Sequence, residues 1–351
     1  MKIDDLLRMA VDRSASDLHL VAGIPPILRI DGKIARTDLP SLSSHDIESF
    51  MKEMITAEKV DEVVKKRDCD SSYNLSGVAR FRLNFHYQRS SLALAIRVVP
   101  YQIPDFRTLG VPQAVQDMIE RDRGLFLVTG ATGAGKSTTL AALLDHLNKV
   151  KELHIITIED PIEFMHGHRK GIVEQREVGI DTASFLTGLK YALRQDPDVI
   201  LVGEMRDFET IAVAVTAAET GHLVLATLHT LDAVSTVDRI VDIFPSAQQS
   251  QVRCQLSESL LGMCSQMLLP RQGGGRAVAC EVLSSTTAIR NLIREGQTAK
   301  ILSQVETGSQ QGMVTFDQSI VRLHREGVIS TDTALGFARD KEQVKMKVFG
   351  S

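Results

Sequence analysis

The feature that most constrains this chain is a glycine-rich motif, G-x-x-x-x-G-K-S, which begins at Gly130 and ends at Ser137. The motif follows the apolar run 125–129 and precedes the helix-forming residues 138–148. A strand, a glycine-rich loop and a helix in this order form a phosphate-binding loop, because backbone N–H groups turn inward and the helix N-terminus adds positive potential. The sequence therefore predicts an α/β domain with this P-loop at the end of a buried strand.

Each position of the P-loop has an expected role. Lys136 is expected to reach the β and γ phosphates of a nucleotide, and Ser137 to ligate Mg²⁺. We predict that the whole run contacts the nucleotide: Gly130, Ala131, Thr132, Gly133, Ala134, Gly135, Lys136, Ser137 and Thr138.

A P-loop site also needs an acid at the end of a neighbouring buried strand, to hold the water shell of the metal or to activate the attacking water. Two apolar runs end in acids: residues 155–158 precede Glu159, Asp160 and Glu163, and residues 199–202 precede Gly203 and Glu204. Strand ends of this kind are where α/β sheets bind ligands. Because Gly203 stands where many P-loop enzymes have Asp, metal contact is expected from Ser137, water and one of the glutamates, with Glu204 as the candidate ligand.

A third buried run, residues 223–228, has a histidine at each end. His229 follows the run, at the same edge of a parallel sheet as the P-loop, and is predicted to sense the γ phosphate. His222 precedes the run at the opposite edge, and its role stays open, because a lone histidine at a strand end is more often a hydrogen-bonded structural residue.

An arginine pair marks the first part of the chain. Residues 80–87 and 92–98 both alternate between polar and apolar side chains, which predicts two strands. A hairpin turn between them would place Arg82 opposite Arg97, and like charges facing each other destabilise a sheet unless an anion or acid lies between them. The two arginines are therefore either solvated or reach a phosphate, which in a ring of subunits would belong to a neighbour.

The domain organisation follows from prolines and apolar periodicity. Pro100 and Pro104 indicate an extended connector. Asp207 is predicted to cap a helix over 208–220, and the chain beyond Pro245 reads as mostly helical, apart from a turn at 271–276 and a strand at 277–283. We therefore predict an N-terminal domain (1–100), a linker (101–112), a P-loop domain (113–285) and a C-terminal helical region (286–351).

Composition excludes several classes of protein. A net charge of −4 argues against a strongly basic nucleic-acid-binding surface, so no nucleic-acid partner is expected. The four cysteines form no C-x-x-C pair, which argues against a zinc cage and a disulfide framework. The chain has no signal-peptide pattern and no run of 18 apolar residues, so we expect a cytoplasmic protein.

Together, these residues resemble the PilT-type retraction ATPases of type IV pili, within the secretion ATPase superfamily. The motifs stand in family order: Ser16–Leu20, the arginine hairpin, the P-loop, Glu159–Glu163 (similar to the Asp box), Asp198–Glu204 (Walker B), Gly221–Thr230 (His box) and Ala288–Glu295, which resembles the C-terminal signature of retraction ATPases. The resemblance implies a PAS-like N-terminal α+β domain, a RecA-like P-loop domain with a helical C-terminal cap, and a homohexamer that hydrolyses ATP.

By the same resemblance, Glu163 is the water-activating base, Glu204 is the Walker B acid, and Arg82 and Arg97 contact nucleotide from the N-terminal domain. The implied partners are the pilus machinery and an inner-membrane platform protein (PilC-like), at the cytoplasmic face of the inner membrane. Extension and secretion relatives typically carry a further N-terminal domain and often a tetracysteine zinc element. Because neither is expected in this sequence, a retraction motor that powers twitching motility is preferred. The alternatives are an accessory retraction ATPase, another pilus or type II secretion ATPase, a small-molecule kinase, a regulatory nucleotide-binding module and a nucleic-acid translocase.

Overall fold

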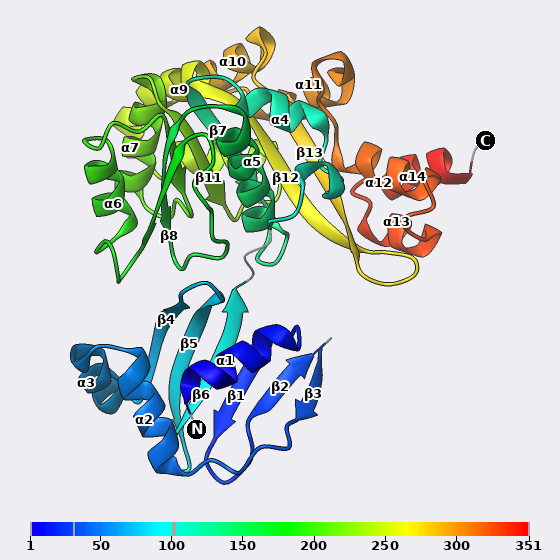
Figure 1. The fold of residues 1–351 in the computed structure, drawn as a ribbon. Helices are drawn as coiled ribbons and strands as arrows, with labels where there is room; N and C mark the ends of the chain where they lie inside the picture. Colours follow the sequence, from blue (N-terminus) through cyan, green and yellow to red (C-terminus); the bar gives the residue numbers. More distant parts are fainter. Residues whose placement is uncertain (1, 31, 100–102, 350–351) are drawn as a thin grey trace. The chain divides into compact units, whose positions relative to one another are not determined.

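A computed structural model describes residues 2–30, 32–99 and 103–349, and the chain divides into two compact units (Figure 1). The first unit comprises residues 1–102 and 163–165, and the second comprises residues 103–162 and 166–351. Residues 101 and 102, at the start of the predicted linker, lie outside the described residues. The rest of that linker belongs to the second unit, where Phe106 is buried.

The first unit is a six-stranded antiparallel sheet with three helices. Its elements are α1 (Ile3–Asp12), β1 (Asp17–Val21), β2 (Ile27–Ile30), β3 (Lys33–Arg36), α2 (Ser44–Met54), α3 (Ala57–Lys66), β4 (Asp68–Leu75), β5 (Ala79–Gln88) and β6 (Ser91–Val99). The strand order is β3-β2-β1-β6-β5-β4. One apolar core joins the three helices to the sheet.

The predicted hairpin is present as β5 and β6. Phe81, Leu83 and Phe85 alternate with polar residues along β5 and are at most 1% exposed, so one face of the strand lies in the core. The turn residues Arg89 and Ser90 have φ values of 47° and 63°, the left-handed conformation that a two-residue hairpin loop needs. This turn fixes the register of the two strands, as predicted.

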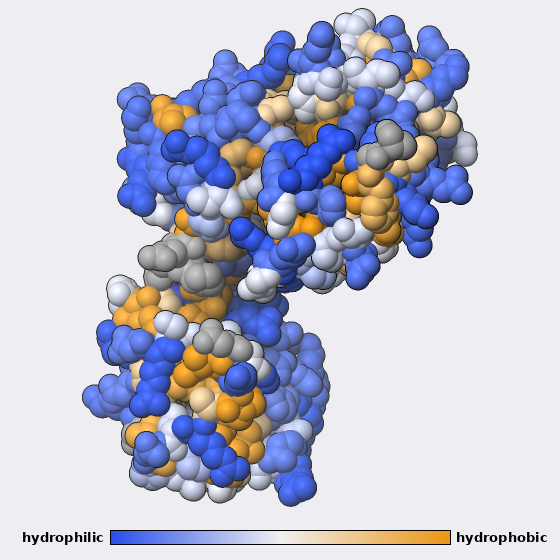
Figure 2. Space-filling model, turned by 90° about the vertical axis from the view of Figure 1, so that its right-hand side faces the viewer, coloured by the Kyte–Doolittle hydropathy of each residue, from blue (hydrophilic) through white to orange (hydrophobic). Residues whose placement is uncertain are grey.

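The strand β3 forms a free edge of the first sheet. Its side chain Ile34 is 56% exposed. The side of the unit on which β3 lies shows apolar atoms among hydrophilic ones (Figure 2). The charged neighbours Lys33 and Arg36 are typical of the way edge strands avoid pairing with other chains.

The second unit is built on a seven-stranded, mostly parallel sheet. Its elements are a 3₁₀ turn (Phe106–Thr108), α4 (Gln113–Ile119), β7 (Gly124–Thr129), α5 (Lys136–Val150), β8 (His154–Glu159), β9 (Ile172–Glu177), α6 (Phe185–Ala192), β10 (Val199–Val202), α7 (Phe208–Glu219), β11 (Leu223–Leu228), α8 (Ala233–Asp242), α9 (Ser246–Ser259), β12 (Leu260–Pro270), β13 (Arg276–Ser284), α10 (Thr287–Arg294), α11 (Ile301–Thr307), α12 (Phe316–Arg325), α13 (Thr331–Phe337) and α14 (Lys341–Phe349), with two further 3₁₀ turns at Thr298–Lys300 and Ser309–Gln311. The strand order is β13-β12-β7-β11-β10-β8-β9, and only β13 runs antiparallel to its neighbour.

Helices cover both faces of this sheet. The core on one face takes apolar side chains from α4 and α5, and the core on the other face takes them from α6 to α11. The strands predicted at 199–202 and 223–228 are confirmed, as is the helix after Asp207, whose carboxylate accepts a hydrogen bond from the Thr210 backbone. Strands buried on both faces are continuous apolar runs, which is why these elements are readable in the sequence.

The expectation that the chain is helical from Pro245 to the 271–276 turn is wrong in part. Helix α9 ends at Ser259, and residues 260–270 form β12, which pairs with β7 on one side and β13 on the other. Polar residues such as Gln266 interrupt the apolar run of β12, and they are buried because they contact the P-loop region. The strand β9, at the far edge of the sheet, also has no counterpart in the sequence-based prediction.

The C-terminal helical region packs on the antiparallel end of the sheet. Residues of α12, α13 and α14 share a separate core with Leu269 of β12 and Ala279 of β13. The strand β13 and the helices that follow agree with the predicted strand at 277–283 and the predicted helical region from 286 onward. Among the described residues, no helix is long and apolar enough to cross a membrane.

Candidate nucleotide site

The P-loop connects β7 to α5, as its motif predicts. Gly130, Gly133 and Gly135 have φ values of +138°, +80° and +90°, a region that side chains other than glycine rarely adopt. A Cβ atom on Gly130 would lie 2.4 Å from the carbonyl oxygen of Gln266. The loop therefore depends on glycine both for its turn and for its close approach to β12.

Lys136 lies in the first turn of α5 with only 9% of its surface exposed. Its Nζ donates hydrogen bonds to the carbonyl oxygens of Gly130 (2.8 Å) and Ala131 (3.1 Å). A buried ammonium needs such partners, and the phosphates of a nucleotide are stronger acceptors than neutral carbonyls. The lysine is thus held inside the loop that would receive the phosphates, at the N-terminus of a 15-residue helix.

The neighbouring strand β12 contacts both elements that flank the P-loop. The Thr129 hydroxyl at the end of β7 donates a hydrogen bond to the Ser265 hydroxyl on β12 (2.8 Å). On the same strand, the Gln266 side-chain amide donates to the Thr139 hydroxyl on α5 (2.8 Å). Sequence reasoning missed these contacts because it read β12 as a helix.

The carboxyl edge of the sheet brings together the P-loop, Glu204 and His229. The strands β7, β11 and β10 are adjacent and parallel, so their ends lie at one edge. His229 places its Nε2 3.1 Å from Oε1 of Glu204 and its Nδ1 3.4 Å from the Thr132 hydroxyl. The histidine therefore bridges the P-loop and the acid that follows β10.

Glu204 is engaged on both carboxylate oxygens. Its second oxygen, Oε2, lies 2.6 Å from a guanidinium nitrogen of Arg206, which the sequence analysis did not single out. Burial alone would raise the pKa of Glu204, but the hydrogen bond from Arg206 and the nearby His229 outweigh it and lower the pKa. Glu204 is thus a stable anion and a weak proton acceptor.

The close packing around residue 203 explains why a glycine occupies this position. A Cβ at this position would lie 3.1 Å from the Ile158 carbonyl oxygen and 3.3 Å from the Glu159 Cα on the neighbouring chain segment. The Thr227 hydroxyl on β11 donates a hydrogen bond to the Gly203 carbonyl. The end of β10 is therefore held tightly between its neighbours, with little space for the aspartate of other P-loop enzymes.

The acids that follow β8 have different surroundings. Glu159 accepts hydrogen bonds from the side chains of Thr157 (2.6 Å) and Gln175 (3.1 Å), so it has a local structural role. Glu163 is exposed and makes no hydrogen bond or ion pair with the described part of the chain. Residues 163–165 group with the first unit. Within the second unit, the structure brings together the P-loop, Glu204 and His229, whereas Glu163 belongs to the other unit.

Arg82 and Arg97 face each other across β5 and β6, as predicted. An acid lies beside one of them: Oδ1 of Asp17, on β1, is 3.0 Å from Nε of Arg97. Burial alone would raise the pKa of Asp17, but hydrogen bonds from Ser16 and Arg97 outweigh it and lower the pKa. The side chain of Arg82 makes no hydrogen bond or ion pair with any residue that the structure describes. The two arginines therefore differ: Arg97 is anchored by Asp17, whereas the side chain of Arg82 is available to bind a ligand.

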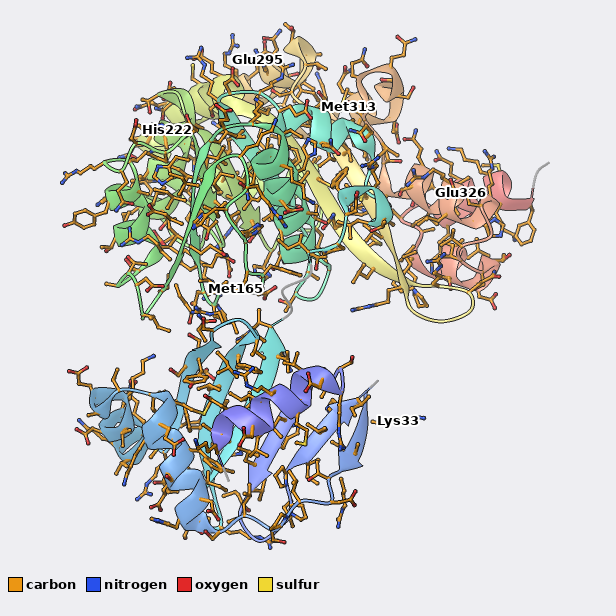
Figure 3. All side chains as sticks on the ribbon, viewed as in Figure 1. Lys33, Met165, His222, Glu295, Met313 and Glu326 are labelled. Carbon is orange, nitrogen blue, oxygen red and sulfur yellow. The ribbon has the colours of Figure 1, made fainter. Side chains whose placement is uncertain are left out.

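His222 has a structural contact at the start of β11, away from the P-loop edge (Figure 3). Its Nδ1 lies 3.1 Å from the Ala217 carbonyl oxygen, near the end of α7, and its backbone N–H donates to the same oxygen. This arrangement closes the connection between α7 and β11.

The predicted helix at Ala288–Glu295 is present as α10, after which Glu295 lies at the surface (Figure 3). Ile289 and Ile293 are fully buried, whereas Ala288, expected on the same face, is exposed. Arg294 is exposed, off the packed face.

Comparisons with known proteins agree with this geometry. A family described as Type II/IV secretion system protein matches residues 2–274. The chain is 46% identical to the type IV pilus retraction ATPase PilT of Pseudomonas aeruginosa over 95% of this chain and 97% of that protein. It is 43% identical to a twitching motility protein of Neisseria gonorrhoeae (97% and 91% covered) and 37% identical to the type IV pilus ATPase PilU of P. aeruginosa (99% and 91% covered). A crystal structure of the pilus retraction motor PilT with bound ADP matches with a TM-score of 0.91 and 47% identity, over 98% of this chain and 99% of that one.

Proposed function

Because this chain belongs to the type II/IV secretion system protein family, and within it to the PilT-type pilus retraction ATPases, we propose that it works as a homohexameric motor in which ATP hydrolysis changes the angle between its two units. It is an ATPase, and its work is the retraction of type IV pili, as in twitching motility. The N-terminal unit serves as a PAS-like domain and the second as a RecA-like P-loop domain. The observation that carries the role of the nucleotide site in this proposal is the bridge from Thr132 through His229 to Glu204.

The P-loop residues have distinct tasks in this reaction. Backbone N–H groups of residues 130–138 and the N-terminus of α5 hold the phosphates of ATP. Lys136 exchanges its contacts with the Gly130 and Ala131 carbonyls for the β and γ phosphates. His229, already within 3.4 Å of Thr132, registers whether a γ phosphate is present.

The residues near the P-loop fit Mg²⁺. Mg²⁺ takes oxygen ligands and keeps several waters, and the Ser137 hydroxyl makes no hydrogen bond with any described residue. Because Arg206 and His229 occupy both oxygens of Glu204, that carboxylate would contact the ion through water. The bound ion would neutralise charge that develops on the phosphates.

The general base is Glu163. A base must accept a proton, and the lowered pKa of Glu204 makes that carboxylate a poor acceptor. Glu163 is exposed and not engaged by another described side chain, so its carboxylate is available to a water molecule. Replacement by glutamine keeps its size and removes the base.

Arg82 serves the active site of a neighbouring subunit. Arg97 is itself anchored and stays beside Arg82. Oδ1 of Asp17 lies 3.0 Å from Nε of Arg97 and anchors that side chain. Arg82 is therefore the arginine whose side chain is able to contact a phosphate. A ring in which each N-terminal unit contributes to the next site couples hydrolysis in one subunit to the motion of another. The hexamer passes this motion to an inner-membrane platform protein (PilC-like) of the pilus machinery, at the cytoplasmic face of that membrane.

A phosphate-release assay tests the catalytic roles. Glu163→Gln should bind ATP normally and lose turnover on the order of 100-fold or more. Glu152→Gln, an exposed acid at the opposite end of β8, is the matched control and should keep normal turnover. If Glu163→Gln loses ATP binding instead, Glu163 is not the base.

Subunit mixing tests the role of Arg82. Hexamers that combine Arg82→Ala subunits with Glu163→Gln subunits should recover part of the activity, because some sites receive an intact arginine from a neighbour and retain their own base. Activity no higher than that of either parent would place Arg82 in its own subunit's site.

The principal retraction motor is favoured over the accessory one. The chain is 46% identical to PilT and 37% identical to PilU of the same organism, at nearly complete coverage of both. Loss of all retraction on deletion of this gene is the result expected of the principal motor.

A further inference from the structure

The segment that follows His229 is held by the C-terminal helical region. Residues 229–232 connect β11 to α8, so His229 is the first residue of this short connection. Asp232 caps α8 by accepting a hydrogen bond from the Ser235 backbone (2.7 Å). The contacts that His229 makes with the P-loop therefore depend on where this connection lies.

A buried acid on β13 contacts the first residue of α8, directly after this connection. Glu281 is 2% exposed, and its Oε1 accepts a hydrogen bond from the Ala233 backbone N–H (2.8 Å). Burial raises the pKa of Glu281. Burying a carboxylate costs desolvation free energy, which a partner of opposite charge offsets.

Arg339, between α13 and α14, is that partner and also reaches the connection itself. One of its guanidinium nitrogens lies 3.2 Å from Oε2 of Glu281, and the other donates to the Leu231 carbonyl oxygen (3.0 Å) and lies 3.4 Å from Asp232. The guanidinium also stacks on the Phe316 ring at 4.5 Å. The planar guanidinium group of an arginine is able to make all these contacts at once, whereas the ammonium group of a lysine is not.

The backbone of Arg339 is fixed as well. Asp317, on α12, accepts hydrogen bonds from the backbone N–H groups of Arg339 and Asp340, both at 2.8 Å. Asp317 is 9% exposed. The arginine thus projects from a rigid support in the C-terminal region onto the connection behind His229.

We propose that Arg339 is a positioning residue, which holds residues 231–233 so that His229 stays in contact with both Thr132 and Glu204. The inference rests on the proposed sensor role of His229. At 3.4 Å the contact between His229 and Thr132 is long for a hydrogen bond, so this contact alone does not fix the position of the histidine against the P-loop. The bridge from Arg339 to the Leu231 carbonyl sets it, and links the helices beyond residue 316 to the nucleotide site.

The test uses Arg339→Lys in the full-length protein. Lysine keeps the charge beside Glu281 and hence the fold, but cannot bridge Glu281, Asp232 and the Leu231 carbonyl together. We expect kcat for ATP to fall about tenfold with KM changed less than twofold, and the thermal unfolding midpoint to stay close to that of the wild type. An unchanged kcat would overturn the proposal.

A double-mutant cycle with His229→Ala separates positioning from a general structural effect. His229→Ala alone should reduce kcat, and adding Arg339→Lys should then cost less than a further twofold, because the contact that Arg339 supports is already gone. A further tenfold loss would show that Arg339 does not act through His229. An unchanged kcat in His229→Ala would overturn the sensor role together with this inference, while leaving the ATPase assignment, which Lys136 tests separately.

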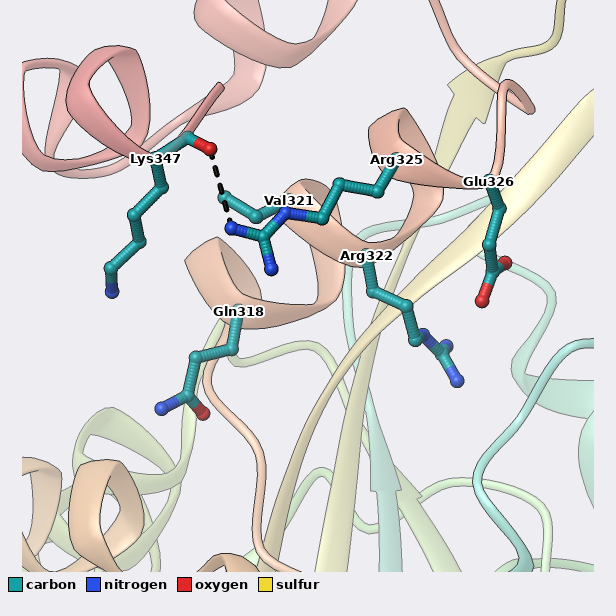
Figure 4. Close-up of a pocket in the computed structure, with 6 residues that line it drawn as sticks. All are labelled: Gln318, Val321, Arg322, Arg325, Glu326 and Lys347. Carbon is teal, nitrogen blue, oxygen red and sulfur yellow. Dashed lines mark hydrogen bonds between the residues drawn. The ribbon is translucent and has the colours of Figure 1, made fainter. Parts of the chain in front are cut away.

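Arg325 provides a matched control in the same helical region. It lies on α12 in a hollow of about 500 Å³ lined by Gln318, Val321, Arg322, Arg325, Glu326 and Lys347 (Figure 4). Its guanidinium donates to the backbone carbonyl of Lys347 at 3.4 Å. Arg325→Ala should leave kcat unchanged, and a tenfold loss there would mean that any disturbance of these helices lowers turnover.

Discussion

Protonation of His166 should destabilise the loop that carries the proposed base. The imidazole of His166 is largely buried, its Nδ1 has no hydrogen-bond partner among the described residues, and its backbone N–H donates to the Gln175 side chain (2.8 Å). Burial lowers its pKa from 6.5 to about 4, although the nearby Asp145 opposes the change. The ring is therefore neutral in the folded protein at pH values where it is charged in the unfolded chain.

The size of the effect follows from linkage. Because the folded pKa is depressed, the stability contributed by His166 is fully present above pH 6.5 and is lost as the pH falls toward 4. A shift of about 2.5 pKa units corresponds to a maximum loss of about 3 kcal/mol, of which about 2 kcal/mol is lost by pH 5.

Urea unfolding at pH 7.5 and pH 5.0 measures this loss. His166→Gln has no titrating ring, so its free energy of unfolding should fall by about 2 kcal/mol less between the two pH values than that of the wild type. His45→Gln, which removes an exposed histidine, is the control and should behave like the wild type. Equal pH dependence in His166→Gln and the wild type, or a His166 ring that titrates above pH 6 by NMR, would show that burial of His166 does not cause the loss of stability.

Three further predictions follow from the site and the C-terminal signature. Lys136→Ala should abolish ATP turnover and weaken nucleotide binding while the fold persists, and wild-type phosphate release would contradict the P-loop assignment. Gly130→Ala should lower the free energy of unfolding by roughly 2–4 kcal/mol in urea, because its Cβ would meet the Gln266 carbonyl at 2.4 Å in a backbone conformation with φ of +138°; an unchanged midpoint would argue against this close approach. Arg294→Ala should keep near-normal ATPase activity but stop pilus retraction in cells, whereas normal retraction with Arg290 also replaced would leave α10 as a packing helix.

The buried parallel strands and the P-loop could be predicted from the sequence because their signals are local. The strands at 199–202 and 223–228 have the predicted bounds, since strands buried on both faces are uninterrupted apolar runs. The register that places Arg82 opposite Arg97 was also predictable, because a two-residue turn fixes it.

Other features depend on which strands become neighbours, and the sequence does not specify this. The pairing of Asp17 with Arg97 joins residues 80 positions apart, and it exists only because β1 lies beside β6. Residues 260–270 are predicted to be helical, whereas they form a strand in which Ser265 and Gln266 are buried because they contact the two elements that flank the P-loop. A run of this length that ends at a proline and a glycine-rich turn is also typical of a buried strand, and was the available signal.

Imaging of labelled pili measures whether ATP turnover at this P-loop powers pilus retraction. In cells whose only copy of this protein carries Lys136→Ala, pili should extend normally and fail to retract, and the wild-type protein should restore retraction. Retraction at the wild-type frequency in the Lys136→Ala cells, or pili that fail to extend, would show that turnover at this P-loop does not specifically power retraction.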